Sequence, residues 1–90
     1  MWQKVKRTVY NTPCVTVQKG RIGINKFVTI ADTVSIEIDP TIPAIRFIEG
    51  DEFTVKKIKG SRYIARTVTR YIPVGHYLLK NNNIFVKEEE

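Results

Sequence analysis

A repeat at a spacing of 40 positions limits the folds open to this 90-residue sequence. Moving the chain along itself by 40 places matches Gly20 with Gly60 and Ile24 with Ile64. The other matched pairs are Lys26 with Arg66, Val28 with Val68, Thr29 with Thr69, Val34 with Val74, and Ile38 with Leu78. A unit of this size cannot bury its own apolar face and has to pack on its copy. We therefore predict an internal repeat of residues 15–49 and 53–87 within a single domain, residues 1–90.

The segments of both repeats have the pattern of β-strands. The clearest case is 34–39, where Val34, Ile36 and Ile38 alternate with polar residues, so that one face is buried and the other is wet. Isoleucine, valine, threonine and tyrosine are frequent throughout, and such side chains fit a pleated sheet better than a helix. The predicted strands lie within 1–10 and at 14–18, 21–25, 34–39, 44–49, 53–58, 63–64, 74–80 and 84–86.

Glycine, proline and asparagine mark the turns between these strands. Turns are predicted at 11–13, 19–20, 39–43, 50–51, 60–61 and 81–83. Two crossovers are predicted, at 26–31 and 66–72. The first is predicted as one to two helical turns, although its β-branched residues disfavour a helix, and the whole fold has at most one or two such turns. The fold class that follows is mainly β. It is a small closed barrel of two pseudo-two-fold related strand-crossover-hairpin repeats, because closure removes exposed sheet edges.

The charge balance favours a polyanionic partner. The chain has 15 basic and 9 acidic residues, which gives a net charge of +6. Three of the acids form the run at 88–90, so the remainder carries about +9 (6 plus 3). A basic surface attracts nucleic acid and releases its counterions on binding. The alternative is that the basic residues serve solubility alone.

The first repeat resembles the AbrB/MazE family of swapped-hairpin DNA-binding proteins. The resemblance rests on Gly-Arg-Ile-Gly-Ile at 20–24, a short crossover, and the strand at 34–39, and it spans residues 15–48. It implies DNA binding through basic residues of the glycine-arginine turn, here Arg21 and Lys26. The family assembles its barrel from two chains, whereas the second repeat would supply the other half here. Asn25 occupies the position at which the family usually has a proline after the motif. In the second repeat, Ser61 occupies the position that corresponds to Arg21.

Basic residues recur at corresponding places in the two repeats. We predict a first cluster of Lys19, Arg21 and Lys26. The second cluster consists of Lys56, Lys57, Lys59, Arg62, Arg66 and Arg70. Two related patches would suit a duplex, which has a dyad of its own. Tyr63 and Tyr71 lie among the clusters and are candidates for base stacking. Solvated side chains that cover apolar surface are the alternative. The predicted nucleic-acid-binding residues are Lys19, Arg21, Lys26, Lys57, Lys59, Arg62, Arg66 and Arg70.

No catalytic or metal-binding constellation is predicted. Cys14 is the single cysteine, and we expect it to be a buried apolar residue. His76 is the single histidine and has no cysteine or histidine partner for a metal. Glu37 and Asp39 share a strand face but have no partner group to complete an acid-base site. An enzyme, a cofactor and a metal ion are therefore not expected.

The sequence favours a small basic DNA-binding protein, a transcriptional regulator of a mobile element or phage, that grips the phosphate backbone of double-stranded DNA. The alternative is a protein-binding module, an antitoxin-like or phage-encoded inhibitor acting on an acidic host protein, for example by strand addition. A homodimer is compatible with both. A single cysteine, no apolar run long enough to span a bilayer and no signal peptide predict a cytoplasmic location.

Overall fold

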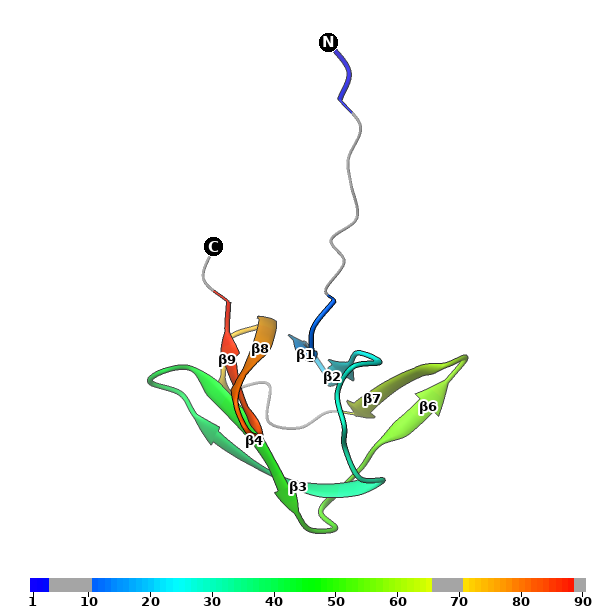
Figure 1. Ribbon diagram of the computed structural model, residues 1–90, viewed down its shortest axis with the longest axis vertical. Helices are drawn as coiled ribbons and strands as arrows, with labels where there is room; N and C mark the ends of the chain where they lie inside the picture. Colours follow the sequence, from blue (N-terminus) through cyan, green and yellow to red (C-terminus); the bar gives the residue numbers. More distant parts are fainter. Residues whose placement is uncertain (4–10, 66–70, 89–90) are drawn as a thin grey trace.

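The computed structural model describes residues 1–3, 11–65 and 71–88, and the described residues form a mainly β, barrel-like sheet (Figure 1). All strand pairings are antiparallel. No α-helix occurs in these residues. The strands are β1 (Cys14–Gln18), β2 (Arg21–Ile24), β3 (Thr33–Asp39), β4 (Ala44–Glu49), β5 (Phe53–Thr54), β6 (Lys56–Ile58), β7 (Ser61–Ala65), β8 (Gly75–Asn81) and β9 (Ile84–Lys87).

The sheet nearly closes on itself. Its strand order is β5-β3-β4-β9-β8-β1-β2-β7-β6. The two strands at the ends of this order, β5 and β6, are successive parts of one extended segment and are separated only by Val55. The Val55 N–H donates to the Asp32 carbonyl at 2.8 Å, beside the short pairing of β5 with β3. The predicted mainly β barrel is thus confirmed.

Hairpins β1–β2 and β6–β7 have equivalent registers. Val17 lies opposite Ile22 in the first, and Lys57 lies opposite Arg62 in the second, 40 positions further along in both strands. Both turns contain a glycine in the left-handed region, with φ of +89° at Gly20 and +83° at Gly60. A side chain is unfavourable at these angles, which explains why glycine occurs in both turns.

Four strand pairs join the repeats to each other, namely β1–β8, β3–β5, β2–β7 and β4–β9, and the last two relate each strand to its own counterpart. In β2–β7, Gly23 lies opposite Tyr63, and in β4–β9, Ile45 lies opposite Phe85. Each pair consists of residues 40 positions apart, so a residue faces its own counterpart in the other repeat. This is the geometry of a pseudo-two-fold axis that passes through both antiparallel pairs.

The match between the two repeats at a constant spacing of 40 residues ends at β8. Val34 is buried in β3, but Val74 is 57% exposed and precedes β8. The residues of β8 that contact the core are Tyr77 and Leu79, which correspond to Ile36 and Ile38 at a spacing of 41. The spacing of 40 returns in β9 after a register shift between Leu79 and Asn81. The predicted match of Ile38 with Leu78 is therefore wrong by one residue.

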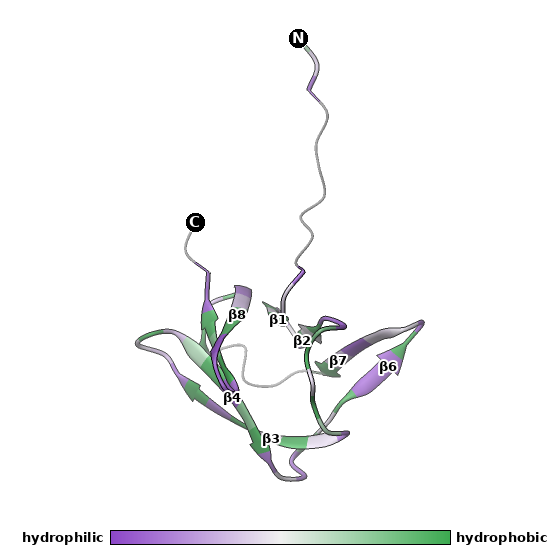
Figure 2. Ribbon diagram, in the orientation of Figure 1, coloured by the Kyte–Doolittle hydropathy of each residue, from purple (hydrophilic) through white to green (hydrophobic). Residues whose placement is uncertain are grey.

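Alternating side chains from every long strand fill the interior, and Figure 2 shows these apolar positions in green beside purple polar neighbours. The largest fully buried side chain is that of Tyr77, whose hydroxyl donates to the Pro73 carbonyl at 2.6 Å. Phe47 and Phe85 pack edge to face with ring centroids 5.7 Å apart. The buried apolar core consists of Val15, Val17, Ile22, Ile24, Val28, Val34, Ile45, Phe47, Ile64, Ile72, Tyr77 and Phe85.

The crossover at 26–31 is not the predicted helix. The Asn25 side-chain oxygen accepts from the Phe27 N–H at 3.1 Å, and the Asn25 carbonyl accepts from the Val28 N–H at 3.2 Å. Such an asparagine turn competes with helix formation, and the β-branched residues that follow it also disfavour a helix. The second crossover, 66–72, lies mostly outside the described residues, as does the strand predicted within 1–10.

Candidate nucleic-acid interface

The basic and the acidic residues lie on different hairpins of the sheet. Residues 14–31 and 55–65, which contain β1–β2 and β6–β7, carry three and four basic residues respectively and no acidic one. Residues 32–54, which contain the β3–β4 hairpin, carry six acids and only Arg46 as a base. We call β1–β2 and β6–β7 the basic hairpins. Pairing of β2 with β7 places them side by side, so their positive charge adds up along one part of the barrel.

The structure regroups the two predicted clusters. Because β2 and β7 are antiparallel and Ile24 lies opposite Arg62, Lys26 extends toward the β6–β7 turn. Arg21 lies opposite Ala65, at the other end of the same strand pair. Lys26 therefore belongs with the charges of the second repeat, and it is separated from Lys19 and Arg21.

Four of the predicted lysines are exposed. Lys19 lies in the β1–β2 turn and Lys59 in the β6–β7 turn, where its φ is +49°. Lys57 lies in β6, opposite Arg62. Lys26 places its ammonium 5.2 Å from the centre of the Phe27 ring. Arg66 and Arg70 lie outside the described residues.

Arg62 has a structural role that its sequence context did not indicate. Its Nη2 donates to the Asn25 carbonyl at 2.6 Å and to the Val28 carbonyl at 2.8 Å, and the side chain is half-buried. These carbonyls border the asparagine turn, so Arg62 fastens the first crossover to β7. No sequence signal predicts it, because its partners are main-chain groups 37 and 34 residues away.

Arg21 contributes to the outer face of the basic hairpins. Its guanidinium lies 5.8 Å from the centre of the Tyr63 ring, and its Nε donates to Gln18 Oε1 at 3.0 Å. A cation over an aromatic ring favours this arrangement. Gly23, opposite Tyr63, adds no side chain to this face. The half-buried Tyr63 ring is thus flanked by a positive charge and by bare backbone.

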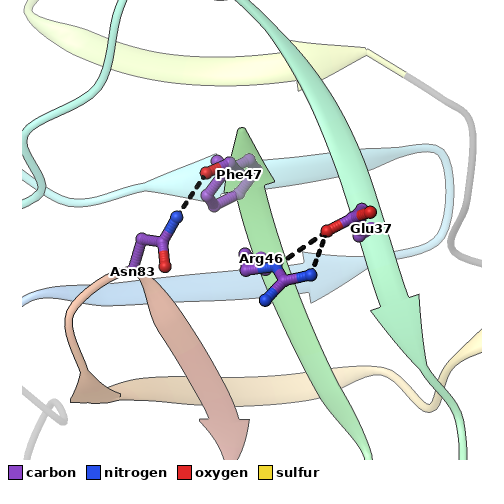
Figure 3. Close-up of polar contacts among 4 residues, drawn as sticks. All are labelled: Glu37, Arg46, Phe47 and Asn83. Atoms are coloured by element: carbon purple, nitrogen blue, oxygen red, sulfur yellow. Dashed lines mark hydrogen bonds and ion pairs between the residues drawn. The ribbon is translucent and has the colours of Figure 1, made fainter. Parts of the chain in front are cut away.

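The remaining candidate residues have separate local partners. Arg46 pairs with Glu37, with Nε 2.8 Å from Oε1 (Figure 3). The Asp39 carboxylate instead accepts from the Thr41 N–H at 3.0 Å, so the two carboxylates have separate partners. The hydrogen bond from the Thr41 hydroxyl lowers the pKa of Asp39. His76 Nδ1 shares a hydrogen bond of 3.1 Å with the Thr16 hydroxyl.

Burial raises the pKa of the Cys14 thiol, so it has little thiolate character. Burial also raises the pKa of Tyr77. Within the part of the chain that the structure describes, no group of three or more His, Cys, Asp or Glu side chains is arranged to hold a metal ion. The same residues contain no helix that is both long and apolar enough to cross a membrane.

An open apolar hollow lies beside the first crossover and is lined in part by Phe27, Ile30 and Phe47. It was not predicted from the sequence. Its lining comes from segments far apart in the chain, so no motif predicts it.

No protein-family model, curated protein or solved structure matches this chain. The resemblance of residues 15–48 to AbrB/MazE proteins therefore stays a prediction from the motif.

Proposed function

We propose that the protein binds double-stranded DNA through the basic hairpins, as a regulator of transcription. The observation that carries the proposal is the division of charge: seven basic residues and no acid occur in residues 14–31 and 55–65, which strand pairing joins. Phosphate contacts of lysine and arginine supply most of the affinity of such a surface. Arg21 beside Tyr63 is the position best suited to reach a base or stack on one.

The test is fluorescence anisotropy of a labelled random duplex at several salt concentrations. We expect the affinity to fall steeply with salt, because each phosphate contact releases counterions. Lys57→Gln should weaken binding and reduce the slope of log K against log salt by about one unit. The matched control is Lys80→Gln, which removes the same charge from β8, outside the basic hairpins.

Two results would refute this proposal. One is binding that ignores salt, and the other is an equal effect of the Lys57 and Lys80 substitutions. Arg62→Ala is unsuitable as a binding variant, because loss of its two carbonyl contacts would disturb the fold. The same measurement repeated with duplexes of different defined sequence reports on base contact, because Arg21→Ala should reduce discrimination between them more than Lys57→Gln does.

A second candidate function is protein binding by strand addition, and the edge of β3 favours it. Beyond the short pairing of Val34 with Phe53, the side of β3 away from β4 has no strand partner among the described residues. An added strand would pair there with residues 36–39. The exposed Glu37 and Asp39 on this strand favour a basic partner rather than an acidic one. Absence of DNA binding at low salt would make this candidate the leading one.

A further inference from the structure

The apolar hollow has a volume of about 880 Å³ and opens to solvent. Five of its largest apolar side chains come from the first crossover, β4, β8 and β9, namely Phe27, Ile30, Phe47, Leu79 and Phe85. The Phe27 side chain remains 41% exposed. Its volume is within the range of ligand-binding pockets, so the hollow has room for a large aromatic side chain.

The charge of the hollow restricts what it can hold. Glu49 and Asp51 belong to its lining, and both are exposed. None of the described residues that line it is basic. A complementary occupant therefore has an apolar anchor and positive charge next to it.

The first ten residues have this chemistry. We call residues 1–10 the N-terminal arm. It contains Trp2, Val5, Val9 and Tyr10 as apolar residues, Lys4, Lys6 and Arg7 as basic residues, and no acid. The arm leads into Pro13, which itself lines the hollow. The side chain of Trp2, the single tryptophan, is fully exposed, and Figure 1 shows residues 1–3 (blue) far from the sheet.

We propose that the hollow binds the N-terminal arm of a second copy of this chain, with Trp2 as the anchor. The basic residues of the arm then face Glu49 and Asp51 at the rim. The nine residue-to-residue steps from Trp2 to Asn11 (11 minus 2) span at most about 30 Å when extended, which is enough to cross to a neighbouring barrel. Reciprocal exchange of two arms gives a symmetric dimer with two identical contacts. Large aromatic anchors in apolar pockets commonly dominate such interfaces.

Trp2 gives this proposal a direct readout, because it is the single tryptophan and its emission reports on its own surroundings. The experiment uses the full-length chain without DNA and measures emission and molecular mass from low micromolar to several hundred micromolar protein. We expect the emission to move to shorter wavelength as the mass rises from 10.4 kDa toward twice that value. Trp2→Ala should weaken dimerisation by at least about thirty-fold, as expected for a hot-spot residue.

A double variant that reverses the charge of Glu49 and Asp51 tests their contribution to binding of the arm. Glu49→Lys with Asp51→Lys should weaken dimerisation and abolish the shift in emission. The matched control is Asp32→Lys with Glu52→Lys, which makes the same charge change at two exposed acids that do not line the hollow and should weaken dimerisation much less. Circular dichroism of each variant verifies that it is folded.

Three results would overturn the proposal. The first is a monomer with solvent-exposed Trp2 emission at every concentration. The second is short-wavelength emission that does not change with concentration, which would place the arm in the hollow of its own chain. The third is a dimer that Trp2→Ala leaves intact, which would place the interface on another face.

Discussion

Hairpins β1–β2 and β6–β7 share a register, a turn glycine and the same relation to the β2–β7 pair, but they place different numbers of side chains in the core. In the first hairpin Val15, Val17, Ile22 and Ile24 are all buried. In the second, every residue of β6 is exposed. The first hairpin thus places four side chains in the core, whereas the second places Ile64 of β7 there and leaves the lysines of β6 exposed.

This difference shows how the strand geometry and the surface can be specified separately. The turn glycines and the alternating pattern determine the hairpin register, whereas the residue at each inward position determines whether that position joins the core. Position 22 holds isoleucine and its counterpart 62 holds arginine. Both stabilise the barrel, the first by packing and the second by bonding main-chain carbonyls.

The largest expected effect is at this pair of positions. Ile22→Ala should lower the free energy of unfolding by about 3 kcal/mol, because it leaves a cavity in a fully buried site. Arg62→Ala should lower it by about 2 kcal/mol, because two partly buried carbonyls lose a charged donor. Urea denaturation measures both. An Arg62 variant as stable as the wild type would show that solvent satisfies those carbonyls equally well.

The loss of unfolding free energy on substitution to alanine should differ most clearly between Val17 and its counterpart Lys57. Val17→Ala removes two methyl groups from a buried site and should cost about 2 kcal/mol of unfolding free energy. Lys57→Ala, at the equivalent exposed position, should change it by less than about 0.5 kcal/mol. Thermal unfolding of the two variants side by side tests this difference. Equal losses would mean that β6 contributes to the core.

Substitution of the two turn glycines by alanine should instead have equal effects on stability. An added Cβ at Gly20 or Gly60 meets no atom within 4 Å, so only the positive φ opposes a side chain. Alanine should therefore cost about 1 kcal/mol at either position. Stability measurements on Gly20→Ala and Gly60→Ala that differ by much more than this would indicate that the two turns are not equivalent.

The smallest effect is expected at Arg21. Arg21→Ala removes the contact with the Tyr63 ring and should cost about 0.5 kcal/mol, since the pair is on the surface. Ser61→Ala, at the equivalent position, serves as the control and should be neutral. If Arg21→Ala weakens DNA binding while stability hardly changes, the side chain acts in recognition rather than in folding.

Local signals predicted most of the fold, and the distant contacts were the part that they missed. Strands 14–18 and 44–49 were predicted with the observed bounds, because alternation and turn residues are local properties. The helix predicted at 26–31 was wrong because Asn25 sets a turn there. The place of Lys26 toward the β6–β7 turn could not be predicted, because chain order does not reveal the antiparallel β2–β7 pairing.

The neighbours of β1 have a consequence for synthesis of the protein. One neighbour, β2, follows immediately, but the other is β8, where Leu78 pairs with Cys14, 64 residues later (78 minus 14). At about 5–20 residues per second, a ribosome needs several seconds to supply the second neighbour. During that time β1 exposes an unpaired edge and apolar side chains. A nascent chain that stalls before β8 is therefore expected to require a chaperone, whereas the finished chain closes its own edge.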